Sequence, residues 1–571
     1  MRMVNNLHAK ENKVISSLRD LVDSSAAVFG DKNLYHYVED GTVKQYTYND
    51  LQANVNAIGT GLLNLGLSEK RVAIIGDNHP LYTTVYLAVA NSNNTIVPFD
   101  RELALDQLEN FCEIAEVEAI FYTAHFNGKL REATKNVARL QYYFPIQPNA
   151  DETGEKVMPA AELIALGNKA IEEGDRSYLD LVPDMERCCS LLFTSGTTGT
   201  SKGVMLCQRN LTAAVNSSCK SMSYDDENRF VSVLPPHHTY EMTCGELGVI
   251  NIGAEAFIND SIKHVMKNFA SFKPNALALV PLFVETMHKR IWDEIRKQGL
   301  EKKVRLAMKA NAALLNVGID IRHKLFGRIT AAFGGNLKSI VCGGAPISPS
   351  IIQDFYHFGI TVLEGYGITE CAPLVAVNSP GKVRFHSVGQ PVYGVDVRID
   401  YDPGQATGEI QVKGENVMLG YYQNEEATAE VFTEDGYFRT GDIGYMDKDG
   451  YIYITGRKKN VIILSNGKNV FPEELEEYLS KIELVSEAVV VGRKNAEDEK
   501  SEVAITAIIV PDMENPALAG KSPEEVHELV RTAVMAINKK LPSFKHITNV
   551  EIRYEPFEKN SSRKIKRYKI K

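Results

Sequence analysis

The chain has 571 residues, which is too long for one ordinary hydrophobic core and predicts two or more domains. Its composition, 44% hydrophobic and 24% charged, is typical of a folded soluble protein and excludes general disorder. The formal net charge of -10 gives no sign of a whole-protein nucleic-acid binder, so we expect no nucleic-acid partner.

The eight cysteines include no Cys-x-x-Cys pair, which favours reduced thiols in a cytoplasmic protein. The N-terminal residues lack the apolar run of a signal peptide, and no apolar stretch approaches the roughly 20 residues of a spanning helix. We therefore expect a soluble protein. Peripheral contact with the inner face of a membrane stays open, as does the choice between monomer and homodimer.

Strand-like and helix-like runs alternate from about residue 72 to residue 333. This alternation predicts an α/β fold with stacked, largely parallel or mixed sheets, two of them in a large N-terminal domain, layered with helices. The expected strands are 72–76, 95–99, 119–123, 190–194, 230–235, 277–281, 339–344 and 360–365, and two expected helices are 210–222 and 281–298.

Residues 388–456 change character, because short strands alternate there with Gly, Asp and Pro turns. We expect a β subdomain at 388–456, within an N-terminal domain that spans 1–456. After a basic run at 457–460, strands and amphipathic helices form a new pattern. This predicts a hinge at 457–460 and a small, mobile α+β domain at 461–571.

The stretch LLFTSGTTGTSKGVML (191–206) leaves a strand for a loop rich in Gly, Ser and Thr. Glycine lets backbone N–H groups approach an anion, hydroxyls add neutral donors and Lys202 adds charge, which suits polyphosphate. The P-loop alternative fits poorly, because Ser201 precedes the Lys, Gly203 follows it, and an extended run continues instead of a helix. A merely structural loop stays open. The expected phosphate-binding residues are Thr194, Ser195, Gly196, Thr197, Thr198, Gly199 and Lys202.

EGYGITE (364–370) also follows an expected strand. Tyr366, flanked by glycines, can stack on a planar base, and Thr369 can donate to phosphate. Glu370 can hold Mg²⁺, which prefers carboxylate oxygen, although a tight turn with a buried Tyr is the structural alternative. In LPPHHTYE (234–241), His237 and His238 could be core residues or metal ligands, but no acidic or Cys partner stands at metal spacing.

In this order, the motifs resemble the signatures of the ANL superfamily of adenylate-forming enzymes, and most closely those of its fatty acyl-CoA synthetase branch. The resemblance covers roughly residues 20 to 570. It implies an AMP-forming acid–thiol ligase that uses ATP, Mg²⁺ and coenzyme A, with Thr194 and Glu370 at the metal. The nucleotide contacts that it implies beyond the loop are Gly343, Ala345, Pro346, Glu364, Gly365, Tyr366, Gly367, Thr369, Asp442 and Arg457.

The resemblance also assigns residues to the binding of the acid and of the thiol. His238, Gly344 and Gly367 line the acid pocket, and Gly467 lies along the pantetheine arm of coenzyme A. Lys459 stands at the family hinge. In FEKNSSRKIKR (557–567) the catalytic lysine is Lys564, although two neighbours depart from the family pattern: Asn560 replaces Thr and Arg563 replaces Gly.

Acetate-specific relatives carry Trp where this chain has Gly367, so we expect an acid longer than acetate. The predicted function is activation of a medium- to long-chain fatty acid to acyl-AMP, then transfer to coenzyme A. An alternative is a ligase that loads a fatty, aryl or amino acid onto a separate acyl carrier protein. A non-catalytic nucleotide-binding or membrane-associated protein is the third, supported by the seven Lys and Arg of 559–571.

Overall fold

The computed structural model describes residues 13–147, 154–194, 202–464, 468–493, 503–559 and 565–570. The chain divides into two compact units, Met1–Asp396 with Val412–Phe438 and Val397–Gln411 with Arg439–Lys571. Parts of the expected β subdomain therefore fall in both units, and the expected boundary at 457–460 stays a prediction.

Among the described residues, the largest sheet of the first unit has seven strands, in the order β18 (Gly420–Tyr421), β8 (Lys202–Cys207), β7 (Cys188–Thr194), β4 (Thr95–Phe99), β3 (Arg71–Ile75), β5 (Ala119–Tyr122) and β6 (Tyr142–Pro145). Strands β3 to β7 pair in parallel, and β8 returns antiparallel to β7. The central strands are almost wholly buried apolar runs, as parallel strands covered on both faces require.

A five-stranded sheet has the order β11 (Ala276–Leu279), β12 (Ser339–Gly343), β13 (Thr361–Gly367), β14 (Leu374–Val377) and β15 (Gln390–Pro391). A four-stranded sheet has the order β2 (Thr42–Thr47), β1 (Asn33–Glu39), β10 (Glu255–Ile258) and β9 (Arg229–Ser232). The α/β class with mixed sheets is confirmed. The described residues of this unit form three sheets where two were expected, because the β1–β2 hairpin pairs with β10 and builds a sheet with it.

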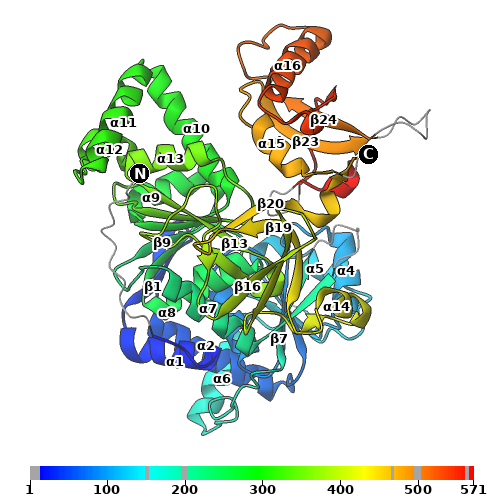
Figure 1. Ribbon diagram of the computed structural model, residues 1–571. Coiled ribbons are helices and arrows are strands. Elements are labelled where there is room, and N and C mark those ends of the chain that lie inside the picture. The colour runs from blue at the N-terminus through cyan, green and yellow to red at the C-terminus, as the bar shows by residue number, and fades with distance from the viewer. Residues whose placement is uncertain are drawn as a thin grey trace. The chain divides into compact units, whose positions relative to one another are not determined.

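Helices cover these sheets (Figure 1). Helix α2 (Tyr48–Asn64) lies against α1 (Leu18–Phe29) and α6 (Ala160–Glu172), and Gly167 permits the second contact, since a Cβ there would lie 1.8 Å from the Ala57 carbonyl oxygen. The unit also contains α3 (Pro80–Ala90), α4 (Leu105–Ile114), α5 (Leu130–Ala133), α7 (Gln208–Ser221), α8 (Gly248–Ile252), α9 (Val265–Phe272), α10 (Pro281–Lys297), α11 (Glu301–Asn316), α12 (Arg322–Ala331), α13 (Pro349–Phe358) and α14 (Glu425–Val431).

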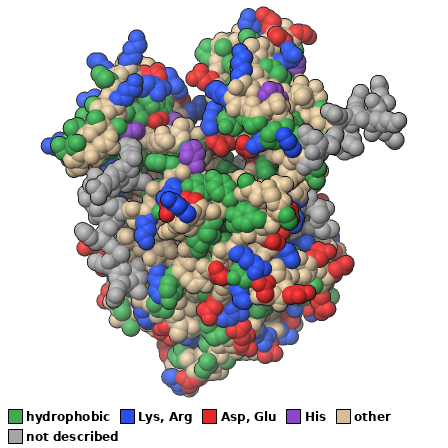
Figure 2. All heavy atoms as spheres, viewed as in Figure 1, with side chains coloured by type: hydrophobic (Ala, Val, Ile, Leu, Met, Phe, Trp, Pro, Cys, Tyr) green, Lys and Arg blue, Asp and Glu red, His purple; other side chains and the backbone are tan. Residues whose placement is uncertain are grey.

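Helices α10 to α13 share an aromatic core that includes Trp292, Phe326, Phe355 and Phe358. Lys and Arg side chains gather on the outer surface of α10 to α12 (Figure 2). None of the described helices combines the length and the hydrophobicity needed to cross a bilayer.

The second unit is α+β, as expected for the C-terminal part. It holds most of a four-stranded sheet, β16 (Val395–Tyr401), β17 (Gly408–Gly414), β19 (Phe438–Met446) and β20 (Ile452–Arg457). The short pair β21 (Ile462–Ile463) and β22 (Asn469–Val470) precedes a three-stranded sheet of β23 (Val485–Arg493), β24 (Ala504–Pro511) and β25 (Asn549–Ile552). Helices α15 (Pro472–Leu479) and α16 (Pro523–Asn538) bury apolar stripes in the same core.

Candidate active site

The β7–β8 hairpin holds together the two ends of the Gly-, Ser- and Thr-rich loop. Thr194 lies opposite Lys202, and its Oγ1 donates to the Lys202 carbonyl oxygen at 3.4 Å. From Lys202 the chain continues as strand β8, whereas a P-loop requires a helix there, so the P-loop alternative is wrong. The loop residues Ser195, Gly196, Thr197, Thr198 and Gly199 lie outside the described residues.

Two glycines face each other at the carboxyl ends of β12 and β13. Gly343 pairs with Gly365, and a Cβ on Gly343 would lie 3.4 Å from the Gly365 carbonyl oxygen and 3.6 Å from the ring of Tyr240. The following turn, 344–346, is exposed, with Gly344 at a φ of +89°. Glycine backbone is therefore accessible at the end of parallel strands, where α/β folds commonly bind ligands.

Tyr366 is a buried residue near the end of β13, with 7% of its surface exposed. At the next residue a side chain has no room, because a Cβ on Gly367 would lie 2.3 Å from the Pro373 carbonyl oxygen. The expectation of an open acid pocket rests on the absence of a side chain at Gly367. The close approach of the Pro373 carbonyl oxygen is by itself sufficient to require glycine at this position.

Glu370 follows in the 3-10 turn Thr369–Cys371. Its Oε1 accepts a hydrogen bond from the Tyr421 hydroxyl at 3.0 Å, and its carbonyl oxygen accepts from the Met418 N–H at 2.8 Å. Because the side-chain partner named here is a neutral hydroxyl, the carboxylate charge is available to a cation. Within the described ranges, no group of three or more His, Cys, Asp or Glu side chains is placed to hold a metal by itself.

Tyr421 is a site residue that the motifs miss. Strand β18 pairs with β8, which puts Tyr421 opposite Val204. The Lys202 ammonium nitrogen lies 4.5 Å from the centre of the Tyr421 ring, while the Tyr421 hydroxyl bonds Glu370. Tyr421 therefore links the end of the loop to the expected metal ligand. The Gly-Tyr-Tyr run at 420–422 carries no local signal of this role, because the contact depends on strand pairing between distant segments.

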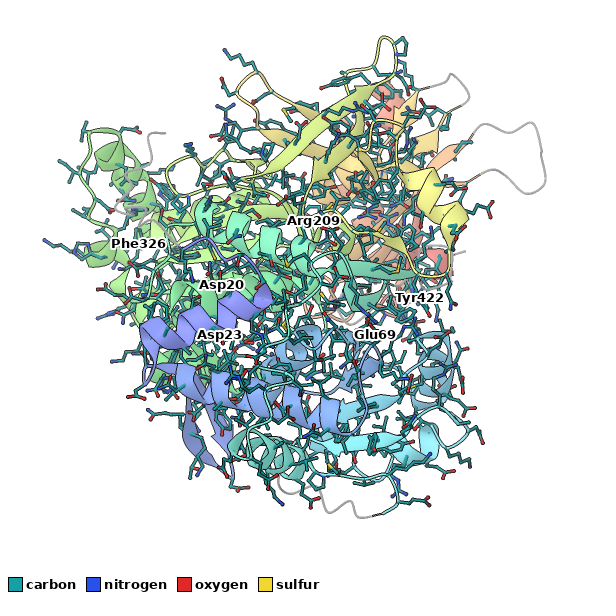
Figure 3. The ribbon with its side chains drawn as sticks, turned by 90° about the horizontal axis from the view of Figure 1, so that it is seen from below. Asp20, Asp23, Glu69, Arg209, Phe326 and Tyr422 are labelled. Atoms are coloured by element: carbon teal, nitrogen blue, oxygen red, sulfur yellow. The ribbon has the colours of Figure 1, made fainter. Side chains whose placement is uncertain are left out.

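Amide and guanidinium donors fix the segment that leads into β18. At the start of α7, Arg209 (Figure 3) and Asn210 donate to carbonyl oxygens of residues 415–417 at 2.7–3.1 Å. Asn416 donates to the Cys371 carbonyl oxygen at 3.0 Å. The segment thus connects α7 to the turn that carries Glu370. These contacts fix the position of the chain just before β18 and Tyr421.

His237 and His238 stand before the π-helix Tyr240–Leu247, with their rings 4.2 Å apart. Burial, and then the charges of His238 and Arg101, hold the pKa of His237 well below its usual range, so this imidazole is neutral. His238 is only half-buried. Its expected place beside the acid stays a prediction.

In the second unit, Asp442 and Arg457 face each other across β19 and β20. Arg457 Nε lies 2.7 Å from Asp442 Oδ1, and Asp442 is 3% exposed. The Asp442 N–H donates to Thr440 Oγ1 at 3.0 Å. Two residues expected at the nucleotide are therefore brought together, and the carboxylate already has a cationic partner.

Lys459 follows β20 in the 3-10 turn Lys458–Asn460. Desolvation, reinforced by the charge of Arg457, lowers the pKa of Lys459 to about 8. Gly467 and Lys564 lie outside the described residues, so their roles stay predictions, as does the hinge.

Carboxylates pair with the described cations of the basic C-terminal stretch. Each of its four described Lys and Arg residues pairs with one, which removes much of the positive charge that a membrane-attracted tail needs. The pairs are Lys559 with Glu487 at 2.6 Å, Lys566 and Lys569 with Glu558 at 2.7 and 2.6 Å, and Arg567 with Glu476.

Known families match almost the whole chain. Residues 22–422 match the AMP-binding enzyme family, and residues 459–571 match the AMP-binding enzyme C-terminal domain. The chain belongs to the AMP-binding enzyme family. This match confirms the resemblance to adenylate-forming enzymes.

Curated relatives of this AMP-binding enzyme include the long-chain-fatty-acid–CoA ligase FadD15 of Mycobacterium bovis, 29% identical over 81% of this chain and 78% of the relative. The peroxisomal long chain acyl-CoA synthetase 7 of Arabidopsis thaliana is 29% identical over 79% of this chain and 68% of the relative. The anthranilate CoA ligase AuaEII has a similar fold, with a TM-score of 0.76 and 18% identity, over 98% of this chain and 97% of that one.

Proposed function

We propose that this AMP-binding enzyme is an ATP-dependent fatty acid–CoA ligase that acts on medium- to long-chain acids. The observation that carries the proposal is the link from Lys202 through Tyr421 to Glu370 at the end of the loop. The names of the curated relatives support the choice of fatty acid and coenzyme A.

The first step turns an inert carboxylate into a mixed anhydride. An oxygen of the acid attacks the α-phosphorus of ATP, the bond to the bridging oxygen breaks, and pyrophosphate leaves with the electron pair. Both reactants are anions, so positioned cations and N–H groups lower the barrier. Lys202 and its loop bind the β- and γ-phosphates, and Lys564 bridges the acid and the α-phosphate.

Glu370 and Thr194 fit a magnesium ion, because Mg²⁺ usually takes one or two protein oxygens together with substrate phosphates rather than an all-protein cage. When bound, the ion neutralises phosphate charge. Tyr366 stacks on the adenine and Thr369 donates to the α-phosphate. Asp442 accepts the ribose hydroxyls, a natural role for a carboxylate facing a diol.

In the second step the thiolate of coenzyme A attacks the carbonyl carbon of the acyl-AMP. A carbon–sulfur bond forms, the carbon–oxygen bond to phosphate breaks, and AMP leaves. His238 lies beside the acid, Gly467 contacts the pantetheine arm, and a rotation at Lys459 exchanges the lysine of the first step for the glycine loop of the second.

A carrier protein as the acceptor is the second candidate. One relative is the long-chain-fatty-acid–[acyl-carrier-protein] ligase AEE15 of Arabidopsis thaliana, 25% identical over 90% of this chain and 78% of the relative. The same activation chemistry then ends on a phosphopantetheine thiol of a protein instead of coenzyme A.

Pyrophosphate release tests the proposal, with acetate, benzoate, octanoate and palmitate as acids, and with coenzyme A or holo-acyl carrier protein as thiol. We expect octanoate and palmitate to release pyrophosphate and to give CoA thioesters, identified by mass spectrometry. Lys564→Ala should lose pyrophosphate release, and Lys459→Pro should lose mainly thioester formation. Thioesters only on the carrier protein would favour the second candidate, and no pyrophosphate with any acid would overturn both.

A further inference from the structure

The outer surface of α10 to α12 is strongly basic in an acidic protein. Residues 281–338 hold 12 Lys and Arg against five Asp and Glu, a net charge of +7, whereas the whole chain has -10. Eleven of these 12 basic residues are exposed, and only Arg322 is buried. Among the described residues, carboxylates within ion-pair distance are found only for Arg296, Arg305 and Arg322.

Aliphatic side chains stand between these cations. On α11 and the residue that ends it, one outward face carries Lys302, Leu306, Lys309, Ala313 and Val317, spaced three or four residues apart and all exposed. Leu306 is 69% exposed and Val317 is 70% exposed. The face is therefore alternately cationic and aliphatic along the helix.

Two further aliphatic residues after α11 are exposed. Ile319, in the connection to α12, is 50% exposed, and Leu325, on α12, is 43% exposed. The inward face of α11 is accounted for, because Met308, Asn311 and Leu315 are buried against the rest of the unit. The outward side chains thus have no role in the core.

We propose that α10 to α12 form a docking surface for a membrane that contains anionic lipid. Lysine ammonium groups reach lipid phosphates while their methylene chains, together with Leu306 and Val317, lie among the acyl chains. An acidic protein would match the positive charge alone, whereas the aliphatic residues between the lysines match a bilayer. The inference rests on the proposed function in one respect: a long-chain acid partitions into membranes, so docking brings the enzyme to its substrate.

Vesicle flotation tests the surface without turnover. The probes are vesicles of phosphatidylcholine alone and of phosphatidylcholine with phosphatidylglycerol, at low and high salt. We expect the full-length enzyme to float with the anionic vesicles and high salt to release it. L306Q/K309E should lower the partition coefficient at least about ten-fold. Each basic residue near an anionic membrane surface strengthens binding, and here one positive charge is replaced by a negative charge.

The matched control is V43Q/K44E, which changes a 60% exposed valine and an exposed lysine on β2 in the same way. It should float like the wild type, and both variants should keep the wild-type melting temperature and octanoate turnover. Equal loss in both variants, or no binding of the wild type to anionic vesicles, would overturn the docking surface. Capture by an acidic carrier protein that L306Q/K309E abolishes, without vesicle binding, would also overturn it. Failure of octanoate turnover in the wild type would instead contradict the proposed function and not the docking surface.

Discussion

The two units hold buried and half-buried carboxylates by different means. In the first unit, Glu370 accepts a hydrogen bond from the neutral hydroxyl of Tyr421. In the second, Asp442 pairs with Arg457, and the half-buried Glu476 pairs with Arg567. The first arrangement positions a negative charge, whereas the second compensates it within the protein.

This difference separates two kinds of consequence. Removing a cation from the second unit strands a carboxylate in a poorly solvated place, which costs folding free energy. Removing the charge of Glu370 leaves a hydrogen-bond acceptor in place and costs little stability, but it removes a ligand for a cation. Stability should therefore respond mainly to changes in the second unit, and turnover to changes at Glu370.

The largest expected effect is that of Arg567→Ala. Burial already raises the pKa of Glu476, and Arg567 is the charge that opposes this rise. Without it, the carboxylate keeps the Val490 N–H as a donor but loses its charge partner, so the second unit should lose about 3 kcal/mol of its free energy of unfolding. Chemical denaturation measures this loss. Lys569→Ala, which breaks a more exposed pair with Glu558, is the control and should leave the free energy of unfolding close to the wild-type value. Equal losses would erase the contrast.

Glu370→Gln tests the expected effect on turnover in the first unit. The amide oxygen can still accept from Tyr421, so the melting temperature should stay at the wild-type value. Pyrophosphate release should fall by about 100-fold or more, because the metal ion that neutralises the phosphate charge loses its carboxylate ligand. A stopped-time pyrophosphate assay over a range of Mg²⁺ concentrations measures the loss. Wild-type turnover in this variant would mean that Glu370 holds no metal.

Tyr421→Phe should have a smaller effect. The ring stays beside Lys202, but the hydrogen bond to Glu370 is lost, so pyrophosphate release should fall about ten-fold. Tyr422→Phe is a matched control, because the ring of Tyr422 faces Arg71 and its hydroxyl accepts from Gln423. If the two variants behave alike, the link through Tyr421 does not position the carboxylate.

Much of the first unit could be predicted from local signals. Strands such as β3 and β4 are short apolar runs bounded by turns, and the motif residues stand at strand ends, where a fold of this class exposes them. Tyr421 could not be found in this way. Its place depends on the pairing of β18 with β8, which joins segments far apart in the chain, and no local pattern encodes such a pairing.

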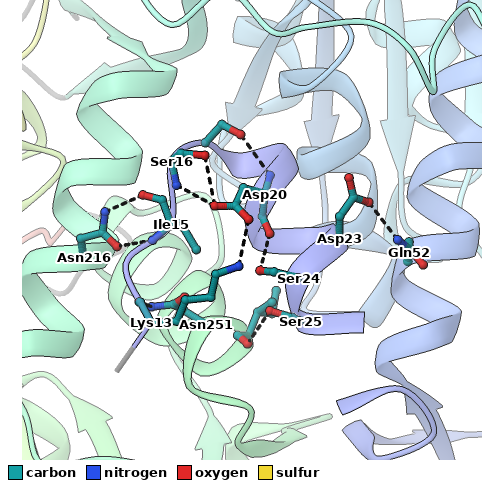
Figure 4. Close-up of polar contacts among 12 residues, drawn as sticks. Lys13, Ile15, Ser16, Asp20, Asp23, Ser24, Ser25, Gln52, Asn216 and Asn251 are labelled. Carbon is teal, nitrogen blue, oxygen red and sulfur yellow. Dashed lines mark hydrogen bonds and ion pairs between the residues drawn. The ribbon is translucent and has the colours of Figure 1, made fainter. Parts of the chain in front are cut away.

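The start of α1 gives a second example. Asn216 on α7 accepts from the Ile15 N–H at 3.0 Å and donates to the Ile15 carbonyl oxygen at 2.9 Å (Figure 4). The Ser16 N–H donates to Asp20 Oδ2 at 2.8 Å, close to the N-cap Ser17. The cap could be predicted from the Ser-x-x-Asp spacing, whereas the contact with Asn216 depends on tertiary packing.

The smallest expected effect is the pH dependence at Lys459. Its pKa is lowered from 10.5 to about 8, so folding disfavours its charged form. The resulting destabilisation is fully present below pH 8 and disappears as the pH rises toward 10.5. Lys459→Gln should therefore raise the thermal midpoint of the second unit at pH 7, and the gain should shrink by pH 9.5.

The neighbouring Lys458→Gln is the control, because it removes an ion pair with Glu409 at 2.8 Å and should lower the midpoint instead. A pH-independent gain in Lys459→Gln would show that desolvation of the ammonium is not the cause. A gain of the expected sign would mean that the turn keeps a lysine at a cost to stability. Ion pairs stabilise the second unit at Arg457 and Arg567, so a destabilising cation between them needs a reason outside folding, and the proposed hinge supplies one.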